Sequence, residues 1–374
     1  MNQGNLLTKE QYWEIPFSAT KKELATKAKL KGISYNFLLD TGAPLFISKE
    51  LQNQFNYPVI VHSETQDAGG NLVRTDIVKI DTIQFGPFIF TDVAAIVIDT
   101  KNTPLECAHI DGNIGSNLLR HLYLQFDVHE KKIAVTDDKK LLKTAFATTF
   151  PMRINQQSDV YMPVKVNGNF ADTVHFDSGD GQLYEMSKKA SERYRDIYAN
   201  DIIRTGNGII SIGIGGVGDF FPQYLIKPKT IKMGNVTASG GTVTIAGNDR
   251  SRVGRELLNY GILELNYPDS TYSFEPYTDA YNSLSYDYGF RSMIDNEDHV
   301  IAGCVWERSE AMEKGLRSGD LILKINETDF SNLSKCDASD ALRKELLQKT
   351  YQIEITFRSG THKPKTIRVN KVEF

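Results

Sequence analysis

Two stretches of the chain share a pattern in which an apolar run ends in an aspartate, a hydroxyl residue and a glycine. Residues 37–44 read FLLDTGAP, and residues 174–179 read VHFDSG. An apolar run with β-branched or aromatic members predicts a buried strand, and the glycine lets the strand end in a tight loop. Asp40 and Asp177 are therefore predicted at the ends of buried strands, where a carboxylate is costly unless it has partners.

The residues before each aspartate also match. Residues 27–32 (KAKLKG) and 163–168 (PVKVNG) both alternate between polar and apolar positions and end in a glycine. This pattern predicts a β-hairpin whose second strand delivers the aspartate. A short polar segment with helical spacing follows each loop, and Ser48 and Ser187 are placed to cap these helices.

A second glycine element follows each aspartate at nearly the same distance. It reads NIGSNLL over residues 113–119 and RVGRELL over residues 252–258, and its glycine lies 75 residues after the first aspartate and 77 after the second. Alternating strands are predicted next, at residues 122–126 and 262–265. Matches in the same order predict an internal repeat rather than two unrelated β segments with chance glycines.

The repeat predicts a mostly β chain with two similar lobes and a third domain. Residues 1–150 hold the first copy, and residues 151–279 hold the second. Residues 280–374 begin with a polar linker and then carry predicted strands and two helices, at 311–316 and 338–347. About 90 residues are enough for a separate α+β domain.

Each copy also carries a predicted hairpin rich in glycine. The first has its tip at residues 67–71, and the second spans residues 205–218. Residues 213–218 match the G-x-G-x-x-G dinucleotide fingerprint, but the sequence DFFP follows where the fingerprint needs a helix. The sequence therefore favours a mobile hairpin over a nucleotide site.

Composition excludes some classes of function. The 43 basic and 47 acidic residues give a net charge near −4 without a basic stripe, which argues against a nucleic-acid partner. No apolar run approaches a membrane span, and residues 1–11 lack the apolar region of a secretory signal, so either the chain is cytoplasmic or a signal was removed. Cys107, Cys304 and Cys336 form no metal-like pair or even-numbered framework, so three lone buried thiols are expected, with no metal and no cofactor.

Two carboxylates on equivalent loops suggest one site shared by the lobes. Because like charges a few ångströms apart cannot both ionise easily, such a pair shares one proton. The ionised acid can take a proton from water while the protonated acid donates to a substrate carbonyl oxygen, which gives water attack on an amide. Thr41 and Ser178 can fix the carboxylates across the lobes, or they can make ordinary turn-stabilising bonds. Gly42 and Gly179 let backbone N–H groups approach.

These paired motifs resemble the pattern of aspartic peptidases over roughly residues 12–276. The NIGSNLL element is similar to the retropepsin-like branch, and two copies in one chain are similar to pepsin-type enzymes. The resemblance implies two acid protease barrels with Asp40 and Asp177 as the catalytic dyad. It also implies hairpin flaps at about residues 67–73 and 206–218 over a cleft for a peptide or protein substrate, with a site that a monomer completes.

Residues 286–374 resemble a bacterial PDZ domain. Tyr288, Gly289 and Phe290 stand where that family has its carboxylate-binding loop, and residues 313–320 (EKGLRSGD) resemble its Gly-Leu-x-x-Gly-Asp signature. The resemblance implies binding of peptide or protein C-termini by strand addition at a sheet edge, unless the groove is occluded. Chains with two such lobes and a PDZ domain are typically bacterial and exported, which implies a periplasmic or surface-anchored location.

One residue departs from the peptidase pattern. Asp180 follows the second triplet, where the family often has Ser, Thr or Ala and the first copy has Ala43. A third carboxylate opposes ionisation of the dyad unless it is paired, so we expect an ion pair between Asp180 and Arg255. Asp180 also favours the alternative of an inactive protease-like scaffold that acts through the PDZ domain. No serine-hydrolase elbow or zinc-protease helix is present, and His175 is expected to be packed or solvated rather than catalytic.

Overall fold

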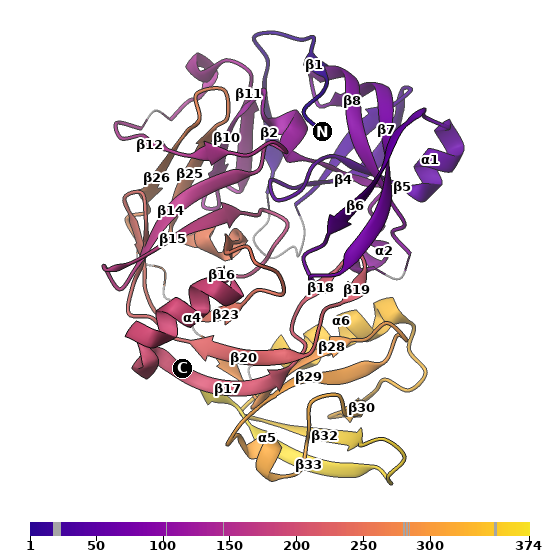
Figure 1. Ribbon diagram of the computed structural model, residues 1–374, viewed down its shortest axis with the longest axis vertical. Helices are drawn as coiled ribbons and strands as arrows, with labels where there is room; N and C mark the ends of the chain where they lie inside the picture. Colours follow the sequence, from indigo (N-terminus) through magenta and orange to yellow (C-terminus); the bar gives the residue numbers. More distant parts are fainter. Residues whose placement is uncertain are drawn as a thin grey trace.

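The computed structural model describes residues 1–17, 24–101, 103–144, 146–279, 281, 283, 285–347 and 350–374. The protein is mostly β, as the sequence predicts. Figure 1 shows the first repeat in indigo and purple at the upper right and the second repeat from magenta to orange at the left. The C-terminal module lies below both repeats in yellow, so the chain forms two lobes and a third body that contacts them.

The first lobe is built around one large sheet. Its elements are β1 (Asn5–Leu6), β2 (Tyr12–Pro16), β3 (Ala25–Leu30), β4 (Ile33–Leu39), β5 (Phe46–Ser48), α1 (Lys49–Phe55), β6 (Val59–Gln66), β7 (Leu72–Phe85), β8 (Phe88–Ile98), α2 (Pro104–Cys107), β9 (Gly112–Ile114), α3 (Ser116–Leu119), β10 (Tyr123–Asp127), β11 (Lys132–Thr136) and η1 (Lys139–Leu141). The sheet has the order β1-β8-β5-β9-β4-β3-β7-β6. β4, which leads to Asp40, therefore lies inside the sheet.

The second lobe repeats this plan. Its elements are β12 (Phe150–Pro151), β13 (Arg153–Ile154), β14 (Val160–Val166), β15 (Phe170–Phe176), β16 (Tyr184–Met186), α4 (Lys188–Ile197), η2 (Ala199–Asp201), β17 (Ile202–Gly208), β18 (Ile212–Gly213), β19 (Gly216–Val217), β20 (Phe221–Ile226), β21 (Ile231–Met233), β22 (Val236–Ala238), β23 (Val243–Ile245), β24 (Arg252–Val253), η3 (Arg255–Tyr260), β25 (Gly261–Asn266) and β26 (Thr271–Pro276). β15 pairs in parallel with β24, just as β4 pairs in parallel with β9.

The local predictions of the repeat are confirmed. β3 and β4 form one hairpin through the two-residue turn 31–32, and β14 and β15 form the other through the three-residue turn 167–169. The hydroxyl of Ser48 accepts a hydrogen bond from the N–H of Leu51 at 3.2 Å, and that of Ser187 accepts one from the N–H of Ala190 at 3.1 Å. These serines cap α1 and α4, because each satisfies an N–H that the first helical turn leaves free.

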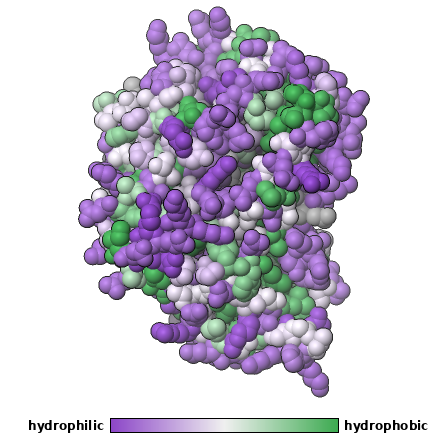
Figure 2. Space-filling view, viewed as in Figure 1, coloured by the Kyte–Doolittle hydropathy of each residue, from purple (hydrophilic) through white to green (hydrophobic). Residues whose placement is uncertain are grey.

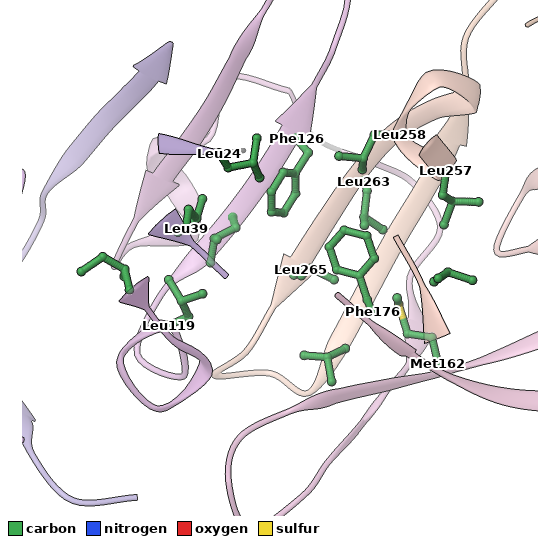
Figure 3. Packing of buried hydrophobic residues seen from close by; sticks show 14 of the residues in the cluster. Leu24, Leu39, Leu119, Phe126, Met162, Phe176, Leu257, Leu258, Leu263 and Leu265 are labelled. Carbon is green, nitrogen blue, oxygen red and sulfur yellow. The ribbon is translucent and has the colours of Figure 1, made fainter. Parts of the chain in front are cut away.

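The two lobes share one sheet and one hydrophobic core. β10 pairs with β25 in a six-stranded sheet of order β12-β26-β25-β10-β11-β2. Figure 3 shows leucines and phenylalanines of both lobes on facing sides of this junction. The rings of Phe126 and Phe176 meet edge to face there, with centroids 5.7 Å apart. Because this core is continuous from Ile15 to Phe274, the predicted boundary at residue 150 stays a prediction.

The C-terminal module has its own core. Its elements are β27 (Tyr286–Asp287), β28 (Phe290–Ile294), β29 (Val300–Trp306), α5 (Glu310–Glu313), β30 (Leu321–Ile325), β31 (Thr328–Asp329), α6 (Lys335–Leu347), β32 (Gln352–Arg358), β33 (Lys365–Asn370) and β34 (Val372–Glu373). Phe290 of β28 and Leu342 of α6 belong to the same buried cluster, and Figure 1 shows α6 beside β28.

Each lobe is attached to the C-terminal module in a different way. β17 of the second lobe pairs with β29, so the sheet continues from lobe to module. The first lobe is joined to it by a disulfide between Cys107 of α2 and Cys336 of α6. The expectation of three lone thiols is therefore wrong for these two and holds for the buried Cys304. The disulfide partners are 229 residues apart, so no local spacing could reveal them.

The face in Figure 2 is largely hydrophilic, with hydrophobic residues in separate patches. Exposed apolar side chains include Val59, Ile60 and Val61 of the edge strand β6. Within the described ranges, no helix has the length and apolar character needed to cross a membrane. The same ranges contain no group of three or more His, Cys, Asp and Glu side chains arranged to hold a metal ion.

Candidate active site

Each aspartate of the repeated motif is held by the same strand arrangement. Asp40 directly follows β4, and its N–H donates to the carbonyl oxygen of Ile114 at 3.1 Å. Asp177 directly follows β15, and its N–H donates to the carbonyl oxygen of Val253 at 2.9 Å. The second glycine element of each copy therefore lies beside the aspartate because it forms the neighbouring strand. This contact explains the similar spacing of the two motifs in both copies.

The structure brings the two aspartates together. A Cβ atom built on Gly42 would collide with the Asp177 carboxylate, and one built on Gly179 would lie 3.2 Å from the Asp40 Cγ atom. The two carboxyl groups are near enough for Asp177 to change the pKa of Asp40. The N–H of Gly42 donates to Asp40 Oδ1 at 2.8 Å, and that of Gly179 donates to Asp177 Oδ1 at 2.9 Å. A side chain at Gly42 would occupy the space of the Asp177 carboxylate, and one at Gly179 would crowd both carboxylates.

The neighbouring hydroxyl residues link the two lobes. The N–H of Thr41 donates to Ser178 Oγ, and the N–H of Ser178 donates to Thr41 Oγ1, both at 3.0 Å. The Thr41 hydroxyl donates across the lobes to the carbonyl oxygen of Phe176 at 2.8 Å, and the Ser178 hydroxyl donates to that of Leu39 at 2.9 Å. Both hydroxyl side chains are fully buried. The bonds cross the lobe boundary and are more than local turn contacts.

The electrostatic environment favours a proton on Asp40. Burial raises the pKa of Asp40 well above its usual range, and the neighbouring Asp177 carboxylate raises it further. The hydrogen bond from the N–H of Gly42 and the neighbouring polar side chain of Asn113 oppose this rise in the pKa of Asp40. An acid that is both buried and next to a like charge binds its proton tightly.

Asp180 has a different partner from the one the sequence suggests. Its Oδ2 atom lies 3.6 Å from Nε of Arg252, and the same Nε lies 2.5 Å from Oε2 of Glu185. Arg255 instead donates to the carbonyl oxygens of Ser178 and Gly179, at 2.8 and 3.1 Å. The predicted Asp180–Arg255 ion pair is therefore wrong, because Arg255 turns toward the backbone of the loop. Arg252 of β24 is the cation that pairs with both Asp180 and Glu185.

A cavity of about 600 Å³ lies over the two aspartates. The tip between β6 and β7 and the small β18–β19 hairpin both line it, at the positions predicted for glycine-rich hairpins. These segments are bonded to each other: the N–H of Gly215 donates to Asp67 Oδ2 at 2.8 Å, and Asn71 Nδ2 donates to the carbonyl oxygen of Val217 at 3.2 Å. The strand β20, not a helix, follows the glycine-rich segment, so the dinucleotide fingerprint lacks its structural context.

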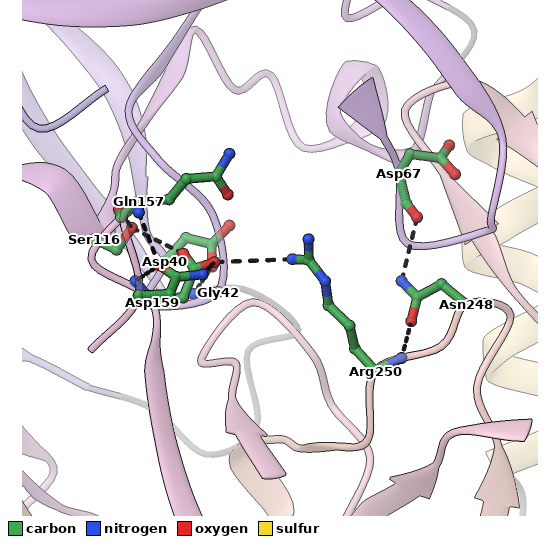
Figure 4. A network of polar contacts seen from close by, with 9 residues as sticks. Asp40, Gly42, Asp67, Ser116, Gln157, Asp159, Asn248 and Arg250 are labelled. Carbon is green, nitrogen blue, oxygen red and sulfur yellow. Dashed lines mark hydrogen bonds and ion pairs between the residues drawn. The ribbon is translucent and has the colours of Figure 1, made fainter. Parts of the chain in front are cut away.

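A polar network that sequence reasoning missed connects the base of the site to the hairpin tip (Figure 4). The Ser116 hydroxyl donates to Asp159 Oδ1 at 3.1 Å, and Asp159 Oδ2 lies 3.8 Å from a guanidinium nitrogen of Arg250. The N–H of Arg250 donates to the Asn248 side chain at 3.0 Å, which donates to the carbonyl oxygen of Asp67 at 3.3 Å. No motif links these residues, because the fold alone brings them together.

His175 is packed, as expected. It is buried, and its ring stacks on Tyr161 with centroids 5.3 Å apart. Burial lowers its pKa, so the imidazole is neutral at neutral pH. It also forms part of the cavity wall.

The predicted carboxylate-binding loop lies in the C-terminal module, and part of it is engaged by the chain itself. Tyr288 and Phe290 are buried, and the Tyr288 hydroxyl donates to the carbonyl oxygen of Thr350 at 2.9 Å. The N–H of Gly289 donates to Oδ1 of the buried Asp287 at 2.8 Å. One backbone donor of this loop therefore already holds a carboxylate.

One comparison with known proteins gives a family match, and it covers part of the first lobe. A family model described as aspartyl protease matches residues 26–118, a stretch within the first lobe that contains Asp40. No curated protein matches the chain. A crystal structure of basic 7S globulin from soybean is similar with a TM-score of 0.39 and 10% identity, covering 72% of this chain and 94% of that one. A likeness that weak carries no functional information.

Proposed function

We propose that this protein is an aspartic endopeptidase that hydrolyses peptide bonds with water activated between Asp40 and Asp177. The observation that carries the proposal is the pair of facing carboxyl groups on equivalent loops, each held by a glycine N–H, below a cavity of about 600 Å³. The aspartyl protease family match in the first lobe supports the same chemistry.

In this mechanism the two acids have different tasks. The raised pKa of Asp40 keeps the shared proton preferentially on that residue, from which it can pass to the carbonyl oxygen of the substrate. Asp177, the other acid of the pair, then accepts a proton from the attacking water. The tetrahedral intermediate collapses when Asp177 passes its new proton to the amide nitrogen and a hydroxyl of the intermediate returns a proton to Asp40, which breaks the C–N bond without a covalent bond to the enzyme.

The residues around the dyad keep this geometry fixed. The hydroxyls of Thr41 and Ser178 tie the loops to each other's lobe, which limits changes in the carboxyl separation. The hairpin tips over the cavity exclude bulk water and strengthen electrostatic interactions beneath them. A single chain supplies both acids, so a monomer is sufficient.

For the C-terminal module we propose PDZ-like binding of peptide or protein C-termini. Among the described strands, β28 pairs only with β29, which leaves one of its edges for strand addition beside α6. The bond between Gly289 and Asp287 is the contact that an incoming carboxylate must replace or share. We also propose an extracytoplasmic location, since disulfides such as Cys107–Cys336 persist in oxidising compartments.

Asp180 favours a second candidate, a non-catalytic scaffold that binds peptides through the C-terminal module. The ion pair with Arg252 weakens this alternative because it offsets the extra charge. A screen of peptide cleavage across pH, with and without a statine-type transition-state mimic, separates the two. Cleavage that the mimic inhibits supports the peptidase. Absence of cleavage and of mimic binding, with peptide binding confined to residues 286–374, supports the scaffold.

A further inference from the structure

Arg252 is the centre of an ion cluster next to the dyad that the mechanism above does not use. It is 8% exposed and belongs to the cavity wall. Its partners come from three segments: the loop after β15, the strand β16 and the tip of the first hairpin. We propose that Arg252 is a positioning residue that holds the Asp177 loop and the tip of the first hairpin in their working places over the dyad, a role that rests on the proposed peptidase function.

The first link runs from Arg252 to the carboxylate of Asp177 through Asp180. The Asp180 side chain lies 3.6 Å from Arg252 Nε. The backbone N–H of the same residue donates to Asp177 Oδ1 at 3.2 Å. The guanidinium therefore orients the loop residue whose N–H helps to hold the catalytic carboxylate.

The second link runs from Arg252 to the hairpin tip of the opposite lobe. A terminal nitrogen of its guanidinium donates to the carbonyl oxygen of Ala68 at 3.2 Å. Because the donor is charged and buried, this bond is stronger than an ordinary neutral one. One side chain of the second lobe thus contacts both the loop below the substrate cavity and the segment above it.

The equivalent position in the first lobe shows what Arg252 adds. In β9 the matching residue is Asn113, which pairs with Phe46, as Arg252 pairs with Glu185. Its side-chain oxygen accepts the N–H of Phe46 at 2.5 Å. The first lobe has no acid at the positions of Asp180 and Glu185, so it needs no cation there. Arg252 is matched to two acids that only the second lobe carries.

The charges around Arg252 set the pH dependence of this arrangement. Burial raises the pKa of Asp180 and raises that of Glu185 to about 7, and in both cases Arg252 opposes the rise. Burial disfavours the charged guanidinium, but the nearby carboxylates outweigh it and raise the pKa of Arg252. The titratable and charged side chains of the surrounding segments are Asp67, His175, Asp177, Asp180, Glu185, Arg250 and Arg255.

A set of single and double charge variants at Arg252 and Glu185, called here the charge cycle, tests the proposal. The readout is the pH profile of kcat/KM, with its acidic and basic limbs. We expect Arg252→Asn, which installs the residue of the first lobe, to move both limbs of the profile upward by about one pH unit, because two acids near the dyad lose their cation. Arg252→Lys keeps the charge and should leave the limbs in place while raising KM. Glu185→Gln should move the limbs downward, and the Arg252→Asn/Glu185→Gln pair should return them toward the wild-type positions.

The matched control is Arg193→Asn, which removes an exposed arginine of α4 that pairs with Asp172, and neither residue lines the cavity. Its profile should coincide with that of the wild type. Circular dichroism and thermal unfolding establish that every variant is folded. A uniform loss of kcat in Arg252→Asn with unmoved limbs would show a structural role only and would overturn the proposal.

Hydrogen exchange in the substrate-free protein tests the contact with the hairpin tip without any activity. Amides of residues 66–72 should exchange roughly tenfold faster in Arg252→Asn and be partly protected in Arg252→Lys. Unchanged exchange contradicts the hairpin link. If the wild type neither cleaves peptides nor binds the statine-type mimic, the proposed function fails and takes the catalytic role of Arg252 with it. Failure of the charge cycle in an active wild type refutes the Arg252 proposal alone.

Discussion

The walls of the cavity differ between the two lobes at positions that the backbone makes equivalent. In the first lobe, Asn113 of β9 lies between Leu38 of β4 and Phe46 of β5. In the second lobe, Arg252 of β24 lies between His175 of β15 and Glu185 of β16. The strand register is the same in both lobes. A neutral, mainly apolar trio in one lobe thus corresponds to an ionisable trio in the other.

This difference separates what the chemistry requires from what can diverge. Both lobes keep the aspartate, the hydroxyl residue and the glycine, as the proposed activation of water by two acids in one fixed geometry requires. The residues that line the cavity beside the two acids do not have to be the same in both lobes. Leu38 and Phe46 join a buried apolar cluster with Ile98 and Ile110, whereas the second lobe holds a buried cation between two acids. Duplication therefore preserved the dyad while the surroundings of the two acids became unequal.

The largest effect should come from the part of the site that is symmetric. Asp40→Asn and Asp177→Asn each remove one acid from the shared pair, so each should lower kcat/KM for peptide cleavage by at least about a thousandfold. The two losses should be similar, and thermal unfolding should change little. Asp196→Asn, an exposed aspartate of α4, is the control and should cleave normally. Undiminished cleavage by either dyad variant refutes the assignment.

The attachments of the two lobes to the C-terminal module provide the next test. Replacing Cys107 and Cys336 together by serine frees the first lobe and leaves the β17–β29 pairing of the second lobe intact. We expect a loss of about 2–5 kcal/mol in the free energy of unfolding, because a cross-link over a long loop restricts the unfolded chain. Denaturant unfolding measures it, and reductant should lower the wild type to the same value. Equal stability with and without the bond would contradict this expectation.

Glu185 occupies the position in the second lobe that Phe46 occupies in the first. Because only Glu185 can ionise, we expect the free energy of unfolding to depend on pH through this residue. Burial raises the pKa of Glu185 to about 7, and the neighbouring Asp180 adds to the rise while Arg252 opposes it. A raised folded-state pKa gives stability that is present below the ordinary value near 4.5 and lost as pH rises through 7. The wild type should gain on the order of 2–3 kcal/mol over Glu185→Gln when pH falls from about 8 to 5. Urea unfolding at each pH measures this difference. An equal pH dependence of the unfolding free energy in the wild type and in Glu185→Gln would contradict the prediction.

The smallest predicted effect concerns the hydroxyls that cross the lobe boundary. Thr41→Val and Ser178→Ala each leave buried hydrogen-bonding groups unpaired, so each should cost about 1–3 kcal/mol of unfolding free energy. The two hydroxyls share one network, so the double variant should lose less than the sum. Urea unfolding of the four proteins in the cycle gives the coupling. If the loss of unfolding free energy in the double variant equals the sum of the two single losses, the two hydroxyls act independently and the prediction is contradicted.

The sequence predicts those parts of the site that depend on short-range pattern. The alternation of residues 27–32 and 163–168 locates both hairpins, and Ser48 and Ser187 mark the starts of both helices. Repetition also places Asp40 in the same local setting as Asp177. These features follow from strand period, glycine turns and caps, which act within a few residues.

The sequence does not predict the contacts that only the tertiary fold creates. Arg252 and Arg255 are three residues apart in one sequence motif, and nothing local decides which of them turns toward Asp180. The Cys107–Cys336 disulfide joins separate bodies. The hydrophobic core that the two lobes share likewise depends on the pairing of β10 with β25, which joins strands from different lobes. In each case the partners meet through topology, which a periodic pattern does not encode.

The most direct test of the shared-proton account is a crystal structure with a statine-type peptide bound. The account predicts that the hydroxyl of the inhibitor lies between Asp40 and Asp177, within about 3 Å of an oxygen of each. A peptide bound outside the cavity contradicts it. So do carboxylates separated by more than about 6 Å, the span that one water molecule bridges.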